Sequence, residues 1–431
     1  MTIPTIIAMS SQTIMGIVNL IIVGSLGYEA IGAVGITNVI ILNLFSLFGG
    51  IGYAINYLSA QQFGAKNHKK CVNYVYTGLY IAILISVPIL ICSFFAPEYI
   101  FKIIGASESV TLIGIGYLSL RLISFCFTMF RTVIIGFTRA VGDTKASMYS
   151  GVLGNVLNIL ISYLLVFGYL GFPEMGILGA GVGFLIAEIV QTIFMIIYFY
   201  TIKTINTRTL MSIREGNYKV VSQESAKIGL EDIGMSAAMI FFTAFAARIG
   251  NMELAATEIA LNVLTLAYLP GIGFGTTATI MIGQKIGEKN NKVASKTGFQ
   301  ILKVATYFLI PLGGVYFFFA EEIAMLFSEE QRVIELTVMV LMFASVFLIV
   351  DGLQLVLAGA LRGVGENTFL LVSSIILGWL FFIPLAYLLT FTFSIGFIGM
   401  WISFYIYIVA LFLVLLYKFL KINWDIVAIK P

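Results

Sequence analysis

The residue best placed for chemistry in this sequence is an aspartate inside a long apolar stretch. Asp351 lies eleven residues before Arg362, which corresponds to about 16 Å along a helix. Desolvation at such a depth favours the protonated carboxyl group, and a carboxylate with neutral oxygens nearby suits a hard cation such as Na⁺. We therefore predict that Asp351 binds an ion. The alternative is a carboxyl group that only hydrogen bonds to a neighbouring helix.

Three more acids accompany Asp351 in the second half of the chain. Glu231 and Asp232 follow soon after Lys227, and Glu258 comes early in the next apolar stretch. We predict that Glu231 and Glu258 assist Asp351 in ion coupling, and that Asp351 and Glu231 form a Na⁺ site if Na⁺ is the ion. The alternative for Glu231 and Asp232 is a solvated helix start, where acids favour the positive end of the helix dipole. Glu258 has the same kind of alternative near its loop.

Other polar side chains inside apolar stretches are candidates for a cavity or a substrate site: Asn19, Asn155, Asn158, Glu188 and Tyr268. Asn155 and Asn158 are three residues apart and therefore share a helix face. The alternative is interhelical hydrogen bonding, which holds membrane helices together without a ligand. Arg121 could pair with Glu188 or with lipid headgroups, and the sequence does not choose between them.

The stretches that hold these residues are typical of membrane spans. Hydrophobic residues make up 60% of the 431 residues, charged residues make up 10%, and mean hydropathy is +1.03. A soluble protein carries roughly a quarter charged residues, and about 20 apolar residues cross a bilayer core. We predict an all-α membrane protein with twelve spans, near residues 3–24, 32–60, 74–96, 111–136, 147–171, 176–202, 226–249, 254–283, 298–320, 333–360, 367–392 and 396–420.

The basic residues predict the orientation of these spans. They gather in the loops after even-numbered spans, as in Lys66, Lys69 and Lys70, whereas the loop after the ninth span holds Glu321 and Glu322. Basic loops stay in the cytoplasm. We expect both termini in the cytoplasm and an integral protein of the cytoplasmic (inner) membrane. The first apolar stretch lacks a basic region before it, so we expect a spanning helix there and not a cleaved signal peptide.

A repeat divides the chain into two halves. Residues 61–67 recur as residues 284–290, and residues 139–143 recur as residues 362–366, both at an offset of 223 residues. Six spans in each half give the two repeats the same orientation, an architecture that transporters build around a central site. The predicted organisation is an N-terminal six-helix lobe (1–203), a cytoplasmic linker (204–225) and a C-terminal six-helix lobe (226–431).

Glycine gathers in the eighth predicted span. Gly271, Gly273 and Gly275 follow directly after Pro270. Small residues allow membrane helices to approach closely, and Pro and Gly in a span can mark irregular backbone beside a cavity. We therefore predict close helix packing together with local unwinding at this point.

Composition argues against several other classes of protein. There is no Walker A sequence, the only histidine is His68, and the three cysteines show no CxxC spacing; these features argue against ATP-driven pumping, an enzyme and a Cys/His metal site. A net charge of +3 is too small to indicate nucleic-acid binding. We expect no cofactor beyond Na⁺ or H⁺ as the coupling ion. The expected partners are a small organic substrate and membrane lipid, and we expect a monomer.

Several of these motifs together resemble the MATE (multidrug and toxic compound extrusion) family. The resemblance rests on residues 18–27, 139–145, 254–260, 269–275, 351–354 and 359–363, spread over nearly the whole chain. It implies two lobes around a V-shaped cavity and cation-coupled export by alternating access. Asp351 falls on the acidic position of the family's tenth helix, Glu231 fits its seventh-helix glutamate, and Glu258 replaces a usual glutamine. Asn19 stands where the family has a first-helix aspartate, which implies a NorM-like pattern with coupling in the second lobe.

We therefore predict an antiporter, driven by Na⁺ or H⁺, that exports organic cationic or amphipathic compounds. One alternative is a lipid-linked oligosaccharide flippase of the same superfamily. Such a protein would need several basic residues for pyrophosphate, and only Arg121 and Arg131 lie within spans. A less favoured alternative is a membrane-embedded lipid-modifying enzyme, which would need clustered His, Asp or Ser residues.

Overall fold

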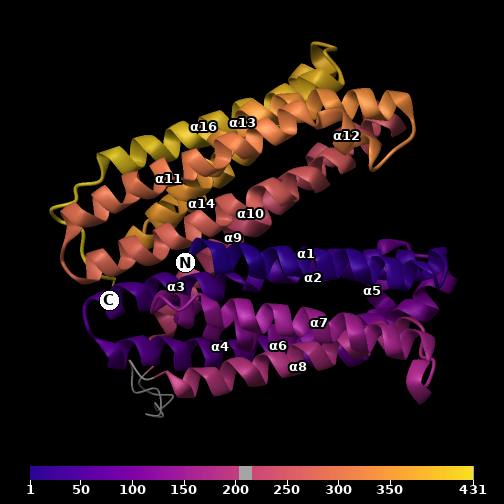
Figure 1. Cartoon of the computed structure of the whole chain (residues 1–431), viewed down its shortest axis with the longest axis horizontal. Coiled ribbons are helices and arrows are strands. Elements are labelled where there is room, and N and C mark those ends of the chain that lie inside the picture. The colour runs from indigo at the N-terminus through magenta and orange to yellow at the C-terminus, as the bar shows by residue number, and fades with distance from the viewer. Residues whose placement is uncertain (203–215, 431) are drawn as a thin grey trace. The chain divides into compact units, whose positions relative to one another are not determined.

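The computed structural model describes residues 1–202 and 216–430, and its regular elements are helices (Figure 1). In chain order they are α1 (Thr2–Gly24), α2 (Tyr28–Phe48), α3 (Gly50–Gly64), α4 (His68–Phe95), α5 (Pro97–Ile104), α6 (Glu108–Ala140), α7 (Lys145–Phe167), η1 (Tyr169–Gly171), α8 (Ile177–Thr201), α9 (Tyr218–Ile249), α10 (Asn251–Gly287), α11 (Asn291–Phe318), α12 (Ala320–Met325), α13 (Gln331–Val364), α14 (Asn367–Ile375), η3 (Ile376–Phe382), α15 (Ile383–Tyr387), η4 (Leu388–Thr392) and α16 (Phe397–Lys421). The all-α class is confirmed.

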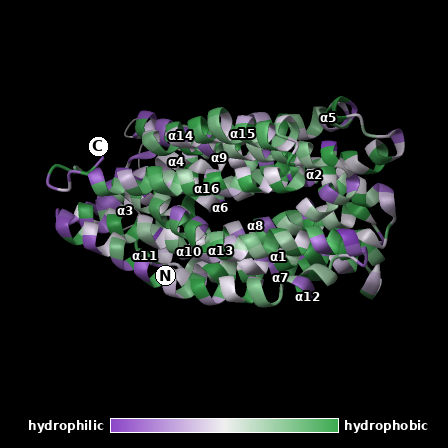
Figure 2. Cartoon of the chain, turned by 90° about the horizontal axis from the view of Figure 1, so that it is seen from above, coloured by the Kyte–Doolittle hydropathy of each residue, from purple (hydrophilic) through white to green (hydrophobic). Residues whose placement is uncertain are grey.

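Twelve segments of the described residues are long and apolar enough to cross a membrane. The second joins α2 to α3, and the eleventh runs from α14 through η4. Hydrophobic residues dominate the helices, and hydrophilic ones gather near helix ends and in connections (Figure 2). Large apolar side chains such as Ile3 (70% exposed) and Leu84 (69% exposed) stand on helix surfaces, as expected where the surrounding solvent is lipid. The predicted twelve spans are therefore confirmed.

The repeat is visible in the helix boundaries. The second span of each half starts at residue 28 or 251, the third at 68 or 291, and the fourth at 108 or 331. These starts keep the 223-residue offset of the sequence motifs. The sixth spans start at residues 177 and 397, so the offset shortens only in and around the fifth span. The two halves are copies of one six-helix plan.

The recurring motif at residues 61–67 and 284–290 is a turn between two spans. Lys66 and Lys289 adopt left-handed backbone angles, with φ of 58° and 57°, which end one helix and redirect the chain. Asn67 then precedes the next helix, and its side chain accepts a hydrogen bond from the Lys70 amide. The repeat therefore preserves a specific loop conformation as well as a charge pattern.

The chain forms two compact units whose division falls within α9, between Gly229 and Leu230. In the first unit α6 is central and packs against α2, α4 and α8; in the second, α13 is central and packs against α10, α11 and α16. These two central helices occupy the same place in the repeat. Of the predicted linker 204–225, residues 204–215 lie outside the described part of the chain, and residues from Tyr218 onward belong to α9.

The glycine run in the eighth span packs closely but does not unwind. A Cβ atom at Gly359 of α13 would lie 2.1 Å from the Gly275 carbonyl oxygen, and one at Gly271 would lie 3.3 Å from the Gly352 Cα. Such contact requires glycine on both helices. The predicted local unwinding is wrong, because α10 is one continuous helix; wide π-helical turns occur instead in η3 and η4 of the eleventh span.

Candidate ion and substrate site

Asp351 lies in the middle of α13, half-buried inside the second unit. Its hydrogen-bonding neighbour is Tyr268 of α10. Tyr405 and Tyr407 of α16 interact with it electrostatically, but their hydroxyls donate elsewhere, to the Val340 carbonyl oxygen (3.1 Å) and to the Met235 sulfur (3.2 Å). Among the described residues Asp351 has no ion-pair partner within 4.0 Å. It is therefore an acid surrounded by phenols.

Aromatic packing fixes the tyrosines around Asp351. The Tyr405 ring stacks on Phe347 at a centroid distance of 4.8 Å, and the Tyr407 ring stacks on Phe382 at 4.9 Å. Because Phe347 precedes Asp351 by one helical turn, the stack and the carboxyl group share one side of α13. The glycine contacts between α10 and α13 hold Tyr268 close from the other helix. Rigid elements thus position the site.

Glu231 is engaged by an arginine and not by Asp351. Its Oε2 atom accepts a hydrogen bond from Arg362 Nη2 at 2.8 Å, and both side chains are only 13% exposed. Asp232 also interacts with Arg362. Arg362 itself lies eleven residues beyond Asp351 on α13, or about 16 Å along the helix axis, and Tyr407 interacts electrostatically with both Glu231 and Asp351. Glu231 is thus held by Arg362, and a Na⁺ site shared by Asp351 and Glu231 stays a prediction.

Glu258 lies near the start of α10 with an exposed side chain, and its backbone carbonyl accepts a hydrogen bond from Asn262 Nδ2 at 2.8 Å. The described residues contain no group of three or more His, Cys, Asp or Glu side chains that could hold a metal ion. A cation at Asp351 would therefore draw its further ligands from neutral oxygens, such as the tyrosine hydroxyls and backbone carbonyls.

The asparagines of the first unit join two helices. Asn19 Nδ2 of α1 donates to Asn158 Oδ1 of α7 at 2.5 Å, and Asn155 Nδ2 donates to Ser11 Oγ at 2.8 Å. Both bonds connect α1 to α7. These contacts match the interhelical hydrogen bonding that the sequence left as an alternative.

Glu188 of α8 forms a two-pronged ion pair with Arg131 of α6. Arg131 Nε and Nη2 donate to the two carboxylate oxygens at 3.0 and 3.1 Å, and the side chains are 17% and 15% exposed. Arg121 instead stacks over the Phe184 ring, 3.6 Å from its centroid. The sequence offered Arg121 as a partner of Glu188 and did not consider Arg131, which lies ten residues further along the same helix.

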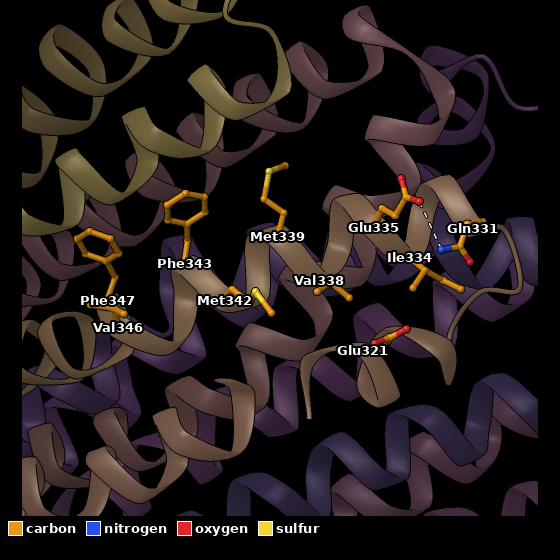
Figure 3. Close-up of a pocket in the computed structure, with 10 residues that line it drawn as sticks. All are labelled: Glu321, Gln331, Ile334, Glu335, Val338, Met339, Met342, Phe343, Val346 and Phe347. Atoms are coloured by element: carbon orange, nitrogen blue, oxygen red, sulfur yellow. Dashed lines mark hydrogen bonds between the residues drawn. The ribbon is translucent and has the colours of Figure 1, made fainter. Parts of the chain in front are cut away.

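A groove of about 670 Å³ runs along the N-terminal half of α13 (Figure 3). Its wall is apolar over most of its length, and Gln331, Glu335 and Glu321 of α12 lie together at one end. Phe343 and Phe347 line the other end and also pack against Tyr405. The groove therefore extends from an acidic mouth to the aromatic residues beside Asp351. The remaining lining residues are Ile334, Val338, Met339, Met342 and Val346. No distinct sequence signal marks this groove, because a stripe of Met and Phe is usually core.

Comparison with known proteins identifies the family to which this architecture belongs. The family model MatE matches residues 4–164 and again residues 228–388. The multidrug resistance protein NorM of Vibrio cholerae is 30% identical over 417 residues, covering 94% of this chain and 90% of that protein. A probable multidrug resistance protein NorM of Bacillus cereus is 27% identical over 349 residues, covering 79% of this chain and 76% of that protein.

Solved structures show the same fold. A multidrug resistance MATE family transporter of the MOP superfamily, in an outward-facing conformation, aligns with a TM-score of 0.88 at 23% identity, covering 97% of this chain and 93% of that one. The double match of the family model coincides with the two six-helix repeats. The resemblance seen in the sequence motifs is confirmed, and this chain is an integral membrane protein that belongs to the MatE family.

Proposed function

We propose that this protein is a cation-coupled antiporter that exports organic compounds across the cytoplasmic membrane, with Asp351 as the ion-binding group. The observation that carries the proposal is the difference between Asp351 and the other acids in the spans. Glu188 and Glu231 are neutralised by Arg131 and Arg362, whereas the described residues provide Asp351 with tyrosines only. Its charge in an apolar interior must be balanced by a bound proton or cation.

Ion binding at Asp351 would act on conformation through differential affinity. A bound H⁺ or Na⁺ removes the negative charge from the interface between α13, α10 and α16, so it stabilises whichever arrangement of these helices buries the site more fully. An ion shifts such an equilibrium only by its difference in affinity for the two states. Tyr268 would contribute by donating to the charged carboxylate when the ion has left.

The groove on α13 supports an amphipathic cation as substrate. Its apolar wall suits a hydrophobic body, and the carboxylate of Glu321 suits a positive group, whereas Glu335 at the same end is already paired with Arg332. The relatives from Vibrio cholerae and Bacillus cereus are described as multidrug resistance proteins, which agrees with a site of this kind. The loops rich in lysine support an orientation with both termini in the cytoplasm.

The arrangement of the arginines supports an exporter over a flippase of lipid-linked oligosaccharides. Arg131 is held by Glu188 and Arg121 by the face of Phe184. Neither guanidinium is therefore available as an open pyrophosphate ligand without loss of an existing contact.

The test is transport by purified protein in lipid vesicles, with a fluorescent amphipathic cation such as ethidium. Na⁺ and pH gradients are imposed separately, and the gradient that drives uphill movement identifies the ion. We expect Asp351→Asn to reduce gradient-driven transport to the level of protein-free vesicles. Asp425→Asn, the same substitution at an exposed position near the C-terminus, serves as the matched control and should leave transport unchanged.

Two further variants separate the roles of the accompanying acids. Glu258→Gln and Glu231→Gln should lower the rate if these residues assist Asp351. Glu231→Gln should also destabilise the protein, because it removes the ion pair between Glu231 and Arg362. Uphill transport that persists in Asp351→Asn would refute the coupling role. Movement of ethidium only down its own gradient, whatever the ion gradient, would refute antiport.

A further inference from the structure

Two short helices occupy equivalent places in the two units. α5 follows the third span and α12 follows the ninth, and each leads into the central helix of its unit. α5 has eight residues and α12 has six, so they are about 12 and 9 Å long and cannot cross a bilayer core of about 30 Å. Because each follows an odd-numbered span, both lie on the membrane face opposite the N-terminus.

The exposed side chains at the two ends of α5 are apolar, and so are those at the equivalent positions around α12. Phe95 and Phe318 come just before the helices and are 74% and 76% exposed; Ile103 and Leu326 come at the other end and are 85% and 81% exposed. Each pair is separated by the 223 residues of the repeat. The neighbouring pairs Phe94 with Phe317 and Ile104 with Phe327 are also exposed and apolar.

The buried positions also coincide, but there the side chains have changed. Phe101 of α5 is fully buried, and its ring fits against Gly114 of α6, where a Cβ atom would lie 2.5 Å from it. In the second unit Ala324 of α12 corresponds to Phe101 and Thr337 of α13 corresponds to Gly114, and both are buried. The short helix therefore carries the larger side chain in the first unit and the smaller one in the second. The apolar exposed pattern is therefore kept even though the packing that holds each helix has been rearranged.

The surroundings of these exposed side chains indicate what covers them. On α4 exposed apolar side chains recur about once per helical turn, at Leu84, Val87, Ile91 and Phe95, so they form one lipid-facing stripe of a span that runs into the short helix. On α5, Glu98 and Lys102 form an exposed ion pair at 2.5 Å, and α12 carries exposed Glu321 and Glu322. Exposed charges on the same short helix as exposed apolar groups are typical of a helix at the membrane–water boundary.

We propose that α5 and α12 are paired boundary helices, which lie at the membrane–water interface on the face opposite the termini and insert their exposed Phe, Ile and Leu side chains among the lipid acyl chains. Each helix then fixes the depth of its own six-helix unit in the bilayer. The proposal rests on the twelve spans and is independent of the coupling role of Asp351.

Site-directed spin labelling in phosphatidylcholine vesicles tests the proposal. Labels are placed on Phe95→Cys and Phe318→Cys in a Cys92→Ser background, since Cys92 is the exposed natural cysteine whereas Cys71 and Cys126 are buried. Relaxation by oxygen reports lipid, and relaxation by a water-soluble nickel chelate reports water. Lys102→Cys and Glu322→Cys, on the same two helices, are the matched controls.

We expect labels at residues 95 and 318 to respond to oxygen more than to nickel, at depths that agree within about one helical turn, 5.4 Å. The control labels should show the reverse preference. Nickel accessibility at residues 95 and 318 equal to that of the controls would place these side chains in water and overturn the proposal. Protection from both reagents would mean that protein, such as a second copy of the chain, covers them, and would also overturn the proposal. If either variant fails to fold, Ile103→Cys and Leu326→Cys test the same prediction at the other end of each helix.

Discussion

Breaking the ion pair between Glu231 and Arg362 by removal of one partner should strongly destabilise the second unit. Its atoms are 2.8 Å apart and both side chains are 13% exposed; at an effective dielectric constant of about 20, that distance gives an attraction of about 6 kcal/mol. Removal of one partner from a buried pair costs about 3–5 kcal/mol, because the other charge stays buried alone. We therefore expect Arg362→Gln to lower the free energy of unfolding by about 3–5 kcal/mol.

Denaturation of the purified protein in detergent measures this effect, and α13 itself provides the control. Arg332 pairs with Glu335 at 3.7 Å, with side chains 56% and 54% exposed, so Arg332→Gln should cost no more than about 1 kcal/mol. The double variant Glu231→Gln/Arg362→Gln should regain only part of the lost stability. Asp232 also interacts with Arg362 and loses that interaction in the double variant. Equal destabilisation by Arg362→Gln and Arg332→Gln would refute the reasoning, as would a double variant less stable than Arg362→Gln alone.

Two other substitutions test the packing of the units. Gly359→Ala should destabilise the protein by about 1–3 kcal/mol, because its Cβ atom would meet the Gly275 carbonyl oxygen at 2.1 Å; Gly314→Ala, with no atom within 4 Å, is the control, and equal unfolding midpoints for the two variants would contradict the close contact. Asn19→Ala should cost about 1–3 kcal/mol, since it leaves the buried Asn158 amide without its partner; a thermal midpoint unchanged from that of the natural protein would show that the bond adds no stability.

The number and limits of the spans followed from the sequence because bilayer thickness and loop charge constrain them independently of any contact. The repeat was visible for a similar reason: a turn such as residues 61–67 depends on local backbone geometry, which its own residues encode. The wide turns of η3 and η4 had no such signal. Their apolar residues read as an ordinary helix, because π-helical turns are rare and hydrophobic composition does not distinguish them from α-helical ones.

The site could be predicted only in part. Asp351 was identifiable because placing a charged carboxylate deep in an apolar span costs free energy, so such a residue usually has a function. The structure surrounds it with tyrosines and gives it no ion-pair partner among the described residues, in agreement with that cost. The partners of Glu188 and Glu231 were not identifiable, because they lie 57 and 131 residues away on helices whose mutual rotation the sequence does not give. Periodicity shows which residues share one face of α6 and α13, but not which neighbouring helix that face meets.

The separation between Glu231 and Arg362 also has a consequence for how the protein is made. Synthesis at about 5–20 residues per second puts 131 residues, or roughly 7–26 s, between the emergence of the acid and that of its arginine. During this interval α9 must enter the membrane, or wait beside the insertion machinery, with an uncompensated carboxylate. In the first unit Arg131 and Glu188 are 57 residues apart, so that pair can form after less than half the delay.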